Sequence, residues 1–170
     1  MRIGLLSDTH ITAGRPVLPP KLIDGLRACD LILHAGDVCD VTGLAAVKAI
    51  GPEVAAVTGN MDRGALVDML PEFHVAETPA GAVLVLHALP HIPGGARAAI
   101  DRLLGGHGRP LAVVHGHTHC PDVQTATLDD GREAYVINPG SAMRPRGYGR
   151  TFATMDLTDG QVRVAIETLD

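Results

Sequence analysis

The chain has 170 residues and a mass of 17.7 kDa, which suffices for one buried core but not for two, so we expect a single domain over residues 1–170. Its composition, 46% hydrophobic and 19% charged, excludes a disordered chain, and no apolar stretch reaches the length of a membrane span. A net charge of −5 and few aromatic residues exclude a protein that binds long nucleic acid, because such binding depends on basic residues.

The cysteines and the first residues of the chain indicate its cellular environment. Cys29, Cys39 and Cys120 are odd in number and show no C-x-x-C spacing, which argues against a disulfide framework or a zinc finger. The first residues reach Asp8 without the pattern of a signal peptide. We therefore expect a cytoplasmic protein with no membrane partner; a homo-oligomer is compatible with this sequence.

Strands and helices alternate over the first two thirds of the chain. Short apolar runs predict buried strands at Met1–Ser7, Asp30–Ala35, Glu53–Thr58, Ala82–Leu86 and Leu111–Val114. The segments between them predict helices at Pro20–Ala28, Val41–Ile50 and Ala96–Leu104. This β-α-β-α-β order implies a mostly parallel sheet with helical crossovers.

The pattern changes after residue 120. Apolar segments are joined there by turns that contain Asp130-Gly131 and Asp159-Gly160, which is typical of hairpins. The strands predicted in this part are Val123–Leu128, Glu133–Ile137, Thr151–Leu157 and Gln161–Thr168. We expect this part to be antiparallel and to belong to a second sheet of one α/β domain.

Polar side chains follow each of the first five predicted strands, at the point where the strand ends. Because ligands bind at the carboxyl edge of the strands in open α/β sheets, these side chains can meet at one site although they are far apart in sequence. The seven candidates are Asp8, His10, Asp37, Asn60, His87, His117 and His119.

These residue types are typical of a metal site. Imidazole nitrogens and carboxylate oxygens without thiolate suit divalent ions such as Mn²⁺, Fe²⁺ or Zn²⁺. There are too many candidates for one tetrahedral ion, and they suit two ions bridged by a carboxylate. Each short motif alone is also a common polar turn, so the indication comes from their joint occurrence at successive strand ends.

In this order the motifs resemble the calcineurin-like metallophosphoesterase superfamily. The matching segments, between residues 8 and 146, are Asp8-Thr9-His10, Gly36-Asp37, Gly59-Asn60, His87 and Gly116-His117-Thr118-His119. The short length, Asn138-Pro139-Gly140-Ser141 and Pro145-Arg146 are similar to its small bacterial and archaeal phosphodiesterase branch. The retromer subunit of eukaryotes is similar to that branch.

The resemblance implies a four-layer α-β-β-α sandwich of two mixed β-sheets flanked by helices. It also implies two divalent ions that share Asp37 as a bridging ligand. The first would be held by Asp8, His10, Asp37 and His119, and the second by Asp37, Asn60, His87 and His117. We expect the ions to be Mn²⁺, with Fe²⁺, Ni²⁺ or Zn²⁺ as alternatives.

The sequence departs from the family pattern at two places. Met61 stands where many members carry a histidine that assists proton transfer, and the small branch generally lacks this histidine too. Ala88-Leu89 replaces the Gly-His pair that usually follows the position of His87. His91, two residues on, is either a substrate-binding residue or a histidine that faces solvent.

Further roles follow for residues near the ligands. We expect Asp37 and Asn60 to act in catalysis together with His34, which either orients Asp37 or is a buried histidine bonded to the backbone. Arg144 and Arg146 either bind a phosphate or are solvated loop residues.

The sequence thus predicts a dinuclear, metal-dependent phosphoesterase that acts on small phosphoesters, foremost a phosphodiesterase. A hydroxide that bridges the two ions would attack phosphorus in line and break a P–O bond. The alternative is a catalytically weak protein of the same fold that serves as an interaction scaffold. A metallo-β-lactamase-like enzyme is disfavoured, because His119 and Cys120 stand where its H-x-H-x-D-H string needs Asp and His.

Overall fold

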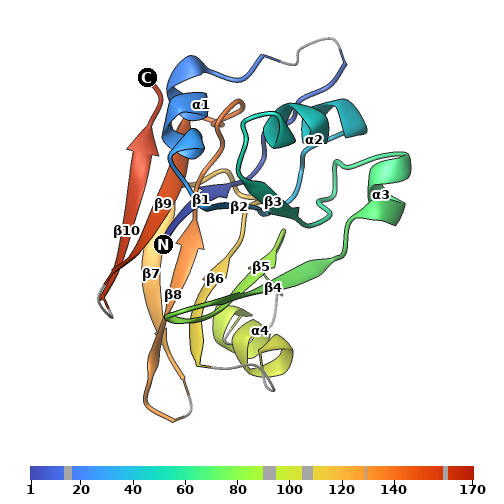
Figure 1. Ribbon diagram of the computed structural model, residues 1–170. Coiled ribbons are helices and arrows are strands. Elements are labelled where there is room, and N and C mark those ends of the chain that lie inside the picture. Colours follow the sequence, from blue (N-terminus) through green and yellow to red (C-terminus); the bar gives the residue numbers. More distant parts are fainter. Residues whose placement is uncertain (14–16, 90–94, 105–108, 129, 159–160) are drawn as a thin grey trace.

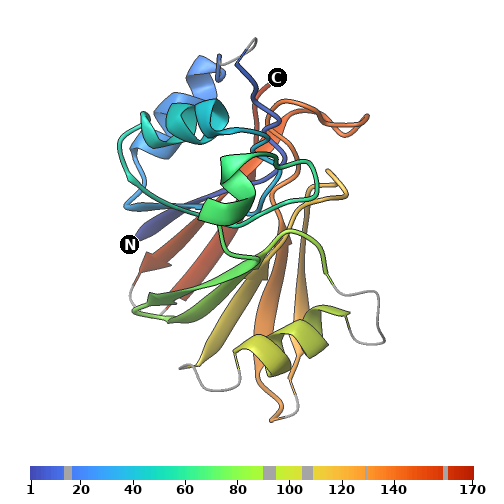
Figure 2. The ribbon, with the colours of Figure 1, turned by 90° about the vertical axis from the view of Figure 1, so that its right-hand side faces the viewer.

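The chain folds into four layers. The computed structural model describes residues 1–13, 17–89, 95–104, 109–128, 130–158 and 161–170, and it contains two five-stranded sheets packed face to face (Figure 1). Helices cover both outer faces, so the order of layers is helix, sheet, sheet, helix (Figure 2). The expected α-β-β-α sandwich of two mixed sheets is confirmed.

The first sheet is parallel on one side and antiparallel on the other. Its strands, in spatial order, are β10 (Gln161–Thr168), β9 (Thr151–Thr158), β1 (Arg2–Leu6), β2 (Leu31–His34) and β3 (Glu53–Ala56). Strands β1, β2 and β3 run parallel, whereas β9 is antiparallel to both β1 and β10.

The second sheet has a parallel centre and two antiparallel edges. Its strands, in spatial order, are β4 (Phe73–Thr78), β5 (Gly81–Leu86), β6 (Pro110–Val114), β8 (Glu133–Asn138) and β7 (Asp122–Thr127). Strands β5, β6 and β8 are parallel, and β4 and β7 close the two edges.

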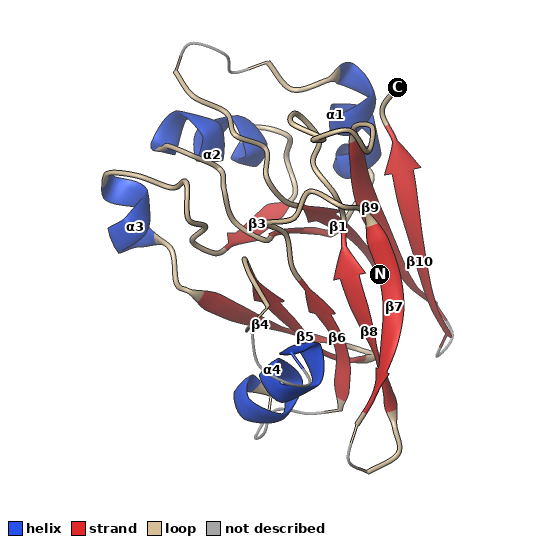
Figure 3. Cartoon of the chain, turned by 180° about the vertical axis from the view of Figure 1, so that it is seen from behind, coloured by secondary structure: helices blue, strands red, loops and turns tan. Residues whose placement is uncertain are grey.

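Helices pack on the outer face of each sheet (Figure 3). Helices α1 (Pro20–Arg27) and α2 (Val41–Lys48) cover the first sheet, and α4 (Gly95–Leu103) covers the second. Helix α3 (Ala65–Met69) lies in the connection between the two sheets. Among the described residues, no helix is long and apolar enough to cross a membrane.

The alternation of side chains along each strand divides the core into layers. Leu5 and Leu33 pack between the two sheets together with Val85 of β5. Their neighbours Leu6 and Ile32 face the opposite way and pack with α1 and α2. Strands buried on both faces therefore read as continuous apolar runs, and this is why the sequence predicted them well.

Two expectations about the sheets need correction. The alternation of strands and helices predicted one mostly parallel sheet, but β5 and β6 lie in the second sheet and only β1, β2 and β3 in the first. We also expected the strands after residue 120 to be antiparallel and to lie in the second sheet, but β9 and β10 belong to the first sheet, where β9 pairs with β1, and β8 pairs parallel with β6. Strand β4 and helix α3 were not predicted. Strand β4 is an edge strand in which only Ala76 is buried, and α3 is a helix of five residues in which only Leu66 is buried, so both are too short or too exposed to show a clear apolar period.

The parallel strands bring the loops that follow them to one edge of the sandwich. In the first sheet, Leu6 is paired with His34, which is paired with Ala56. In the second, Val85 is paired with Val114. Because all five strands end at the same side, the loops that carry the predicted ligands come together there.

Replacement of a buried leucine tests the packing between the sheets. Leu5 is fully buried in this layer, so Leu5→Ala should lower the free energy of unfolding by about 2–5 kcal/mol, because it removes apolar contacts and leaves a cavity. Val67→Ala, at a position 52% exposed on α3, should change it by less than about 0.5 kcal/mol. Urea denaturation measures both, and equal losses would contradict the assigned core.

Candidate metal centre

The seven predicted metal ligands all gather at the loop edge of the sandwich. They come from the loops after β1, β2, β3, β5 and β6, and thus from both sheets. They form two groups that meet at one carboxylate: Asp8, His10 and His119 on one side, and Asn60, His87 and His117 on the other, with Asp37 between them.

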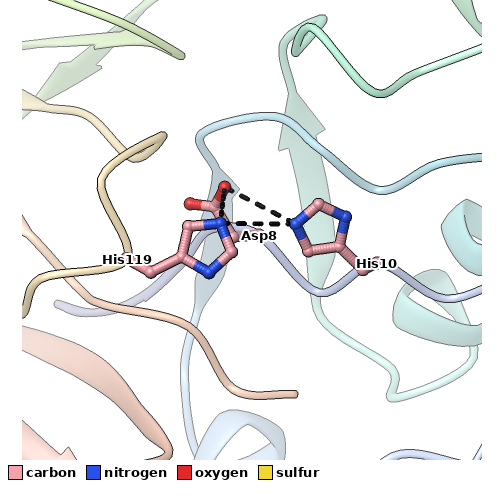
Figure 4. Close-up of side chains that lie close together, drawn as sticks. All are labelled: Asp8, His10 and His119. Atoms are coloured by element: carbon pink, nitrogen blue, oxygen red, sulfur yellow. Dashed lines mark hydrogen bonds and ion pairs between the residues drawn. The ribbon is translucent and has the colours of Figure 1, made fainter. Parts of the chain in front are cut away.

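The first group joins the loops after β1 and β6. Figure 4 shows its three side chains pointing toward a common centre. Asp8 Oδ1 lies 3.1 Å from His119 Nε2 and 3.9 Å from His10 Nε2, and the two histidine Nε2 atoms are 3.4 Å apart. These three atoms all lie within 4.8 Å of one another, so they can coordinate a single cation.

The second group gathers around Asn60. The Oδ1 atom of Asn60 lies 2.9 Å from His87 Nε2 and 2.8 Å from His117 Nδ1. Asp37 lies between this group and the first, because its Oδ1 is 3.5 Å from His87 Nε2 and its Oδ2 is 3.7 Å from His10 Nε2. Each oxygen of this carboxylate therefore faces a different group.

Backbone carbonyls fix the orientation of two histidine rings. His87 Nδ1 lies 2.8 Å from the carbonyl oxygen of Ala35, and His119 Nδ1 bonds the carbonyl oxygen of Arg144. A carbonyl only accepts, so both Nδ1 atoms carry the proton and donate it. The Nε2 atoms of His87 and His119 then present bare lone pairs to the centre, as metal-binding histidines do.

Asp8 has one oxygen that fits a cation and no other partner. Its Oδ2 accepts hydrogen bonds from Ser7 Oγ and from the backbone N–H of His117 at 3.0 Å. Its Oδ1 is buried and has no hydrogen-bond donor among the described residues, although it points at the histidine nitrogens. A buried carboxylate oxygen without a donor is costly, and a bound cation would satisfy it. The residues therefore fit a divalent metal.

Five of the seven candidate ligands share an unusual backbone conformation. The φ angles are 53° at Asp8, 47° at His10, 59° at Asp37, 70° at His117 and 60° at His119. Residues other than glycine rarely adopt this left-handed region, and each instance costs free energy. Five such residues in one cluster show that the fold holds these side chains in an arrangement that the local sequence does not favour.

Burial favours the neutral form of two histidines in this region, His10 and His34. It lowers the pKa of His10 from its usual value, although Asp37 and Asp8 oppose the shift. It also lowers the pKa of His34, which is fully buried, to about 3. A neutral imidazole has a lone pair for a metal, whereas a protonated one does not.

His34 lies near the centre but contacts Thr9. Its Nε2 is 3.0 Å from Thr9 Oγ1, and its Nδ1 has no hydrogen-bond partner among the described residues. Of the two alternatives for His34, the structure favours the buried histidine over the residue that orients Asp37. Its hydrogen-bond partner is the hydroxyl of Thr9, whereas we expected a backbone group. Thr9 stands between two ligands, so His34 supports their loop.

The predicted substrate-binding residues differ in their placement. Arg144 and Arg146 line a cavity of about 320 Å³ together with His10, His119 and Met61. The two arginines therefore lie at the first group of ligands. His91 lies outside the described residues.

Several polar residues that support the ligands were not predicted. Ser7 binds Asp8, and Ser141 Oγ donates to the carbonyl oxygen of Asp8 at 2.7 Å. Asp62 accepts from the N–H of Cys39 and of Gly59, and so joins the loops after β2 and β3. Such residues contact loops distant in sequence, and the only sequence signal was that Asn138-Pro139-Gly140-Ser141 matched a family segment.

Cys39 contacts a ligand rather than serving only as a packing residue. Its Sγ lies 3.3 Å from His10 Nδ1. Burial, helped by the nearby Asp37, raises the pKa of this thiol to about 11. Cys39 is therefore a protonated partner of His10 and not a candidate thiolate ligand.

The family of the protein follows from a family model as well as from this site. A model of the calcineurin-like phosphoesterase superfamily domain matches residues 1–160, and the chain belongs to this superfamily. A "Probable metallophosphoesterase" of Methanocaldococcus jannaschii is 36% identical over 146 residues, which cover 86% of this chain and 70% of that protein. A protein of the same name from Methanothermobacter thermautotrophicus is 33% identical, with 86% and 80% covered.

Solved structures share the fold. Vacuolar Protein Sorting 29 from Cryptosporidium parvum has a TM-score of 0.72 and 23% identity, covering 98% of this chain and 96% of that one. A novel archaeal phosphodiesterase has a TM-score of 0.71 and 21% identity, covering 98% and 100%. Vps29 from Entamoeba histolytica in complex with Zn²⁺ has a TM-score of 0.69 and 20% identity, covering 100% of both chains.

Addition of metal should stabilise the folded protein. A cation that binds only the folded state, at a hundred times its Kd, adds about 2.7 kcal/mol. For a chain of this size, Mn²⁺ should then raise Tm by roughly 5–10 °C relative to protein in EDTA. The measurement is thermal unfolding followed by circular dichroism or calorimetry.

The variant Asp37→Asn tests whether this rise in Tm comes from the candidate site. Loss of the carboxylate between the two groups should remove most of the Mn²⁺-dependent rise in Tm. Asp68→Asn, at an exposed carboxylate on α3, should keep the full rise. A rise of the same size in Asp37→Asn would show that the metal binds elsewhere.

Proposed function

We propose that the protein is a metal-dependent hydrolase of small phosphoesters, acting foremost on phosphodiesters. The observation that supports this most is the position of Asp37, whose two oxygens face separate groups of nitrogen and oxygen ligands. One carboxylate between two ligand groups suits a pair of divalent cations. Membership in the calcineurin-like phosphoesterase superfamily supports the same class of reaction.

The ligand sets divide between two cations. Asp8, His10, His119 and one oxygen of Asp37 would hold one, and Asn60, His87, His117 and the other oxygen of Asp37 would hold the second. When bound, such cations lower the pKa of water and stabilise negative charge on a phosphoryl group. Mn²⁺ is our proposed metal, because the set holds nitrogen and oxygen but no thiolate.

The protein's own residues would orient the substrate. Arg144 and Arg146 line the cavity at the first ligand group, and a guanidinium there can donate two hydrogen bonds to phosphoryl oxygens. Asp8 and His119 are each held by the hydrogen bonds described above, so their ligand atoms keep their place as the substrate binds.

Met61 determines which leaving groups can depart. It lines the same cavity, and its N–H donates to Asp37 Oδ1 at 2.6 Å, which holds the residue beside the centre. A thioether has no proton to give to a departing alkoxide. Esters whose leaving group is stable without a proton, such as aryl phosphodiesters, should therefore be the better substrates.

The second candidate function is that of an interaction scaffold. The fold similarity to Vacuolar Protein Sorting 29 favours it, since that name describes sorting and not hydrolysis. All seven ligand positions of this chain nevertheless carry residues that can bind a metal. A scaffold needs no such set, so we place hydrolysis first.

Substrate preference tests the proposed activity. With Mn²⁺, bis-p-nitrophenyl phosphate should be hydrolysed faster than glucose 6-phosphate, because only the former has a good leaving group. Asp37→Ala and His117→Ala should each lower turnover by ~100-fold or more, since even hydrogen-bond partners of metal ligands are worth about 10–100-fold. His74→Ala, at a histidine on β4 outside the seven, is the control.

Two results would contradict the proposal. A clear preference for glucose 6-phosphate would contradict the assignment to diesters and good leaving groups. The absence of turnover with Mn²⁺, Fe²⁺, Ni²⁺ and Zn²⁺, in protein shown by metal analysis to be loaded, would favour the scaffold.

Restoring a proton donor should widen the range of substrates. Met61→His places an imidazole in the cavity beside His10 and His119 and should raise hydrolysis of glucose 6-phosphate by at least ~10-fold, since a positioned general acid contributes about 10²–10⁴-fold. Met61→Leu keeps the size without the proton and should show no gain. Equal rates for the two variants would mean that proton transfer to the leaving group does not limit the reaction.

A further inference from the structure

A second cavity lies at the other side of the metal centre. It has a volume of about 540 Å³ and lies between α4 and the adjoining ends of β4 and β5. His87, which belongs to the second ligand group, forms part of its wall, and so does Thr58 from the loop that carries Asn60. The cavity therefore adjoins the ligands opposite to those near Arg144 and Arg146.

The walls of this cavity suit a flat apolar group. Leu86, Ala98, Ala99 and Leu103 supply aliphatic surface, and Phe73 supplies an aromatic ring. Its volume lies within the range of roughly 300–1,000 Å³ that is usual for binding sites of small molecules. A space of this size exceeds what a phosphate alone requires.

Phe73 is the exposed one of the two phenylalanines of this chain. The sequence holds two phenylalanines and no tryptophan. Phe152 is buried in the core at 3% exposure, whereas Phe73 is 42% exposed at this cavity. An aromatic face left open beside a catalytic centre can stack on the ring of a ligand.

Two charged groups complete the cavity. Glu72 and Arg102 line it together with the apolar residues. A carboxylate accepts hydrogen bonds and a guanidinium donates them, so the pair can meet both kinds of polar atom on the edge of a heterocycle. Apolar walls with a few polar groups are typical of sites that orient a small ligand.

We propose that this cavity binds an aromatic ring carried by the phosphoester substrate. The phosphoryl group would lie at the metal centre, the ring against Phe73 and Ala98, and the other substituent toward Arg144 and Arg146. The ring belongs either to a nucleobase or to a simple aryl ester. This orientation rests on the proposed function, whereas binding of the ring is measurable without catalysis.

A single tryptophan reports binding directly. Phe73→Trp gives the protein its only tryptophan, whose fluorescence can be followed in EDTA during addition of adenosine, phenyl phosphate or glucose 6-phosphate. We expect saturable quenching by adenosine, by phenyl phosphate or by both, and none by glucose 6-phosphate. Quenching by adenosine identifies a nucleobase site, and quenching by phenyl phosphate alone identifies a simple aryl site.

Three further variants show whether quenching comes from this cavity. Ala98→Phe, made in the Phe73→Trp protein, should raise the half-saturating concentration by at least tenfold, whereas Ala98→Ser should not, because only the larger side chain fills the space. Gln161→Trp places a lone tryptophan in another cavity, at the start of β10 and far from the carboxyl end of β1, and should not be quenched. Thermal unfolding checks that each variant is folded.

Kinetics with Mn²⁺ separates this proposal from the proposed function. Thymidine 5′-(p-nitrophenyl phosphate) and methyl p-nitrophenyl phosphate share the p-nitrophenolate leaving group. If the base fills the cavity, Ala98→Phe should lower kcat/KM for the thymidine ester, relative to kcat/KM for the methyl ester, at least tenfold. An equal fall for both esters assigns the cavity to the nitrophenyl ring.

Each proposal can fail without the other. Quenching without hydrolysis by any variant would retain the ring site and reject the phosphoesterase. The ring site would be overturned, and the phosphoesterase retained, by hydrolysis in which neither aromatic probe quenches the tryptophan and Ala98→Phe leaves the kcat/KM values unchanged.

Discussion

The candidate metal centre depends on a parallel ladder that continues beyond the ends of two strands. After β1 and β2 end, the N–H of Asp8 still bonds the carbonyl oxygen of Gly36, and the N–H of His10 bonds that of Asp37, each at 3.0 Å. Two loops are thus held side by side as though they were strands. Asp8 extends this order to the second sheet, because its Oδ2 accepts the N–H of His117. Displacement of Asp8 would separate ligands that come from opposite sheets.

The same arrangement concentrates unfavourable terms at the loop edge. Two carboxylates, Asp8 and Asp37, are almost completely buried, and burial of the neighbouring His10 disfavours the positive charge that could compensate them. Left-handed backbone at the ligands adds strain. A sandwich with three apolar layers can sustain this local cost, whereas a small loop-rich protein cannot. Divalent cations would offset the charge term, so metal binding and folding stability are coupled here.

The sequence predicts those parts of the structure that single segments encode. Apolar runs such as Ile3–Leu6 identify buried strands, and the Asp and His residues after them identify ligands, because both signals are local. The partner of β9 is not local. Its pairing with β1 depends on the packing of the whole chain, and the sequence after residue 120 reads the same in either sheet. The hydroxyl of Ser141 and the contact of His34 with Thr9 depend on distant loops in the same way.

The two sides of the centre differ in chemistry, and this difference bears on selectivity more than the ligands do. In the proposed function, the metal centre binds a phosphoryl group, which every phosphoester has. On one side lie two arginines, and on the other lies a larger, mostly apolar cavity beside His87. A monoester has one substituent and fills one side only, whereas a diester has two and can occupy both. In the proposed function, Met61 has no proton to supply, so this residue gives monoesters no acid catalysis. In the proposed function, shape and leaving group therefore act in the same direction, toward unsymmetrical diesters.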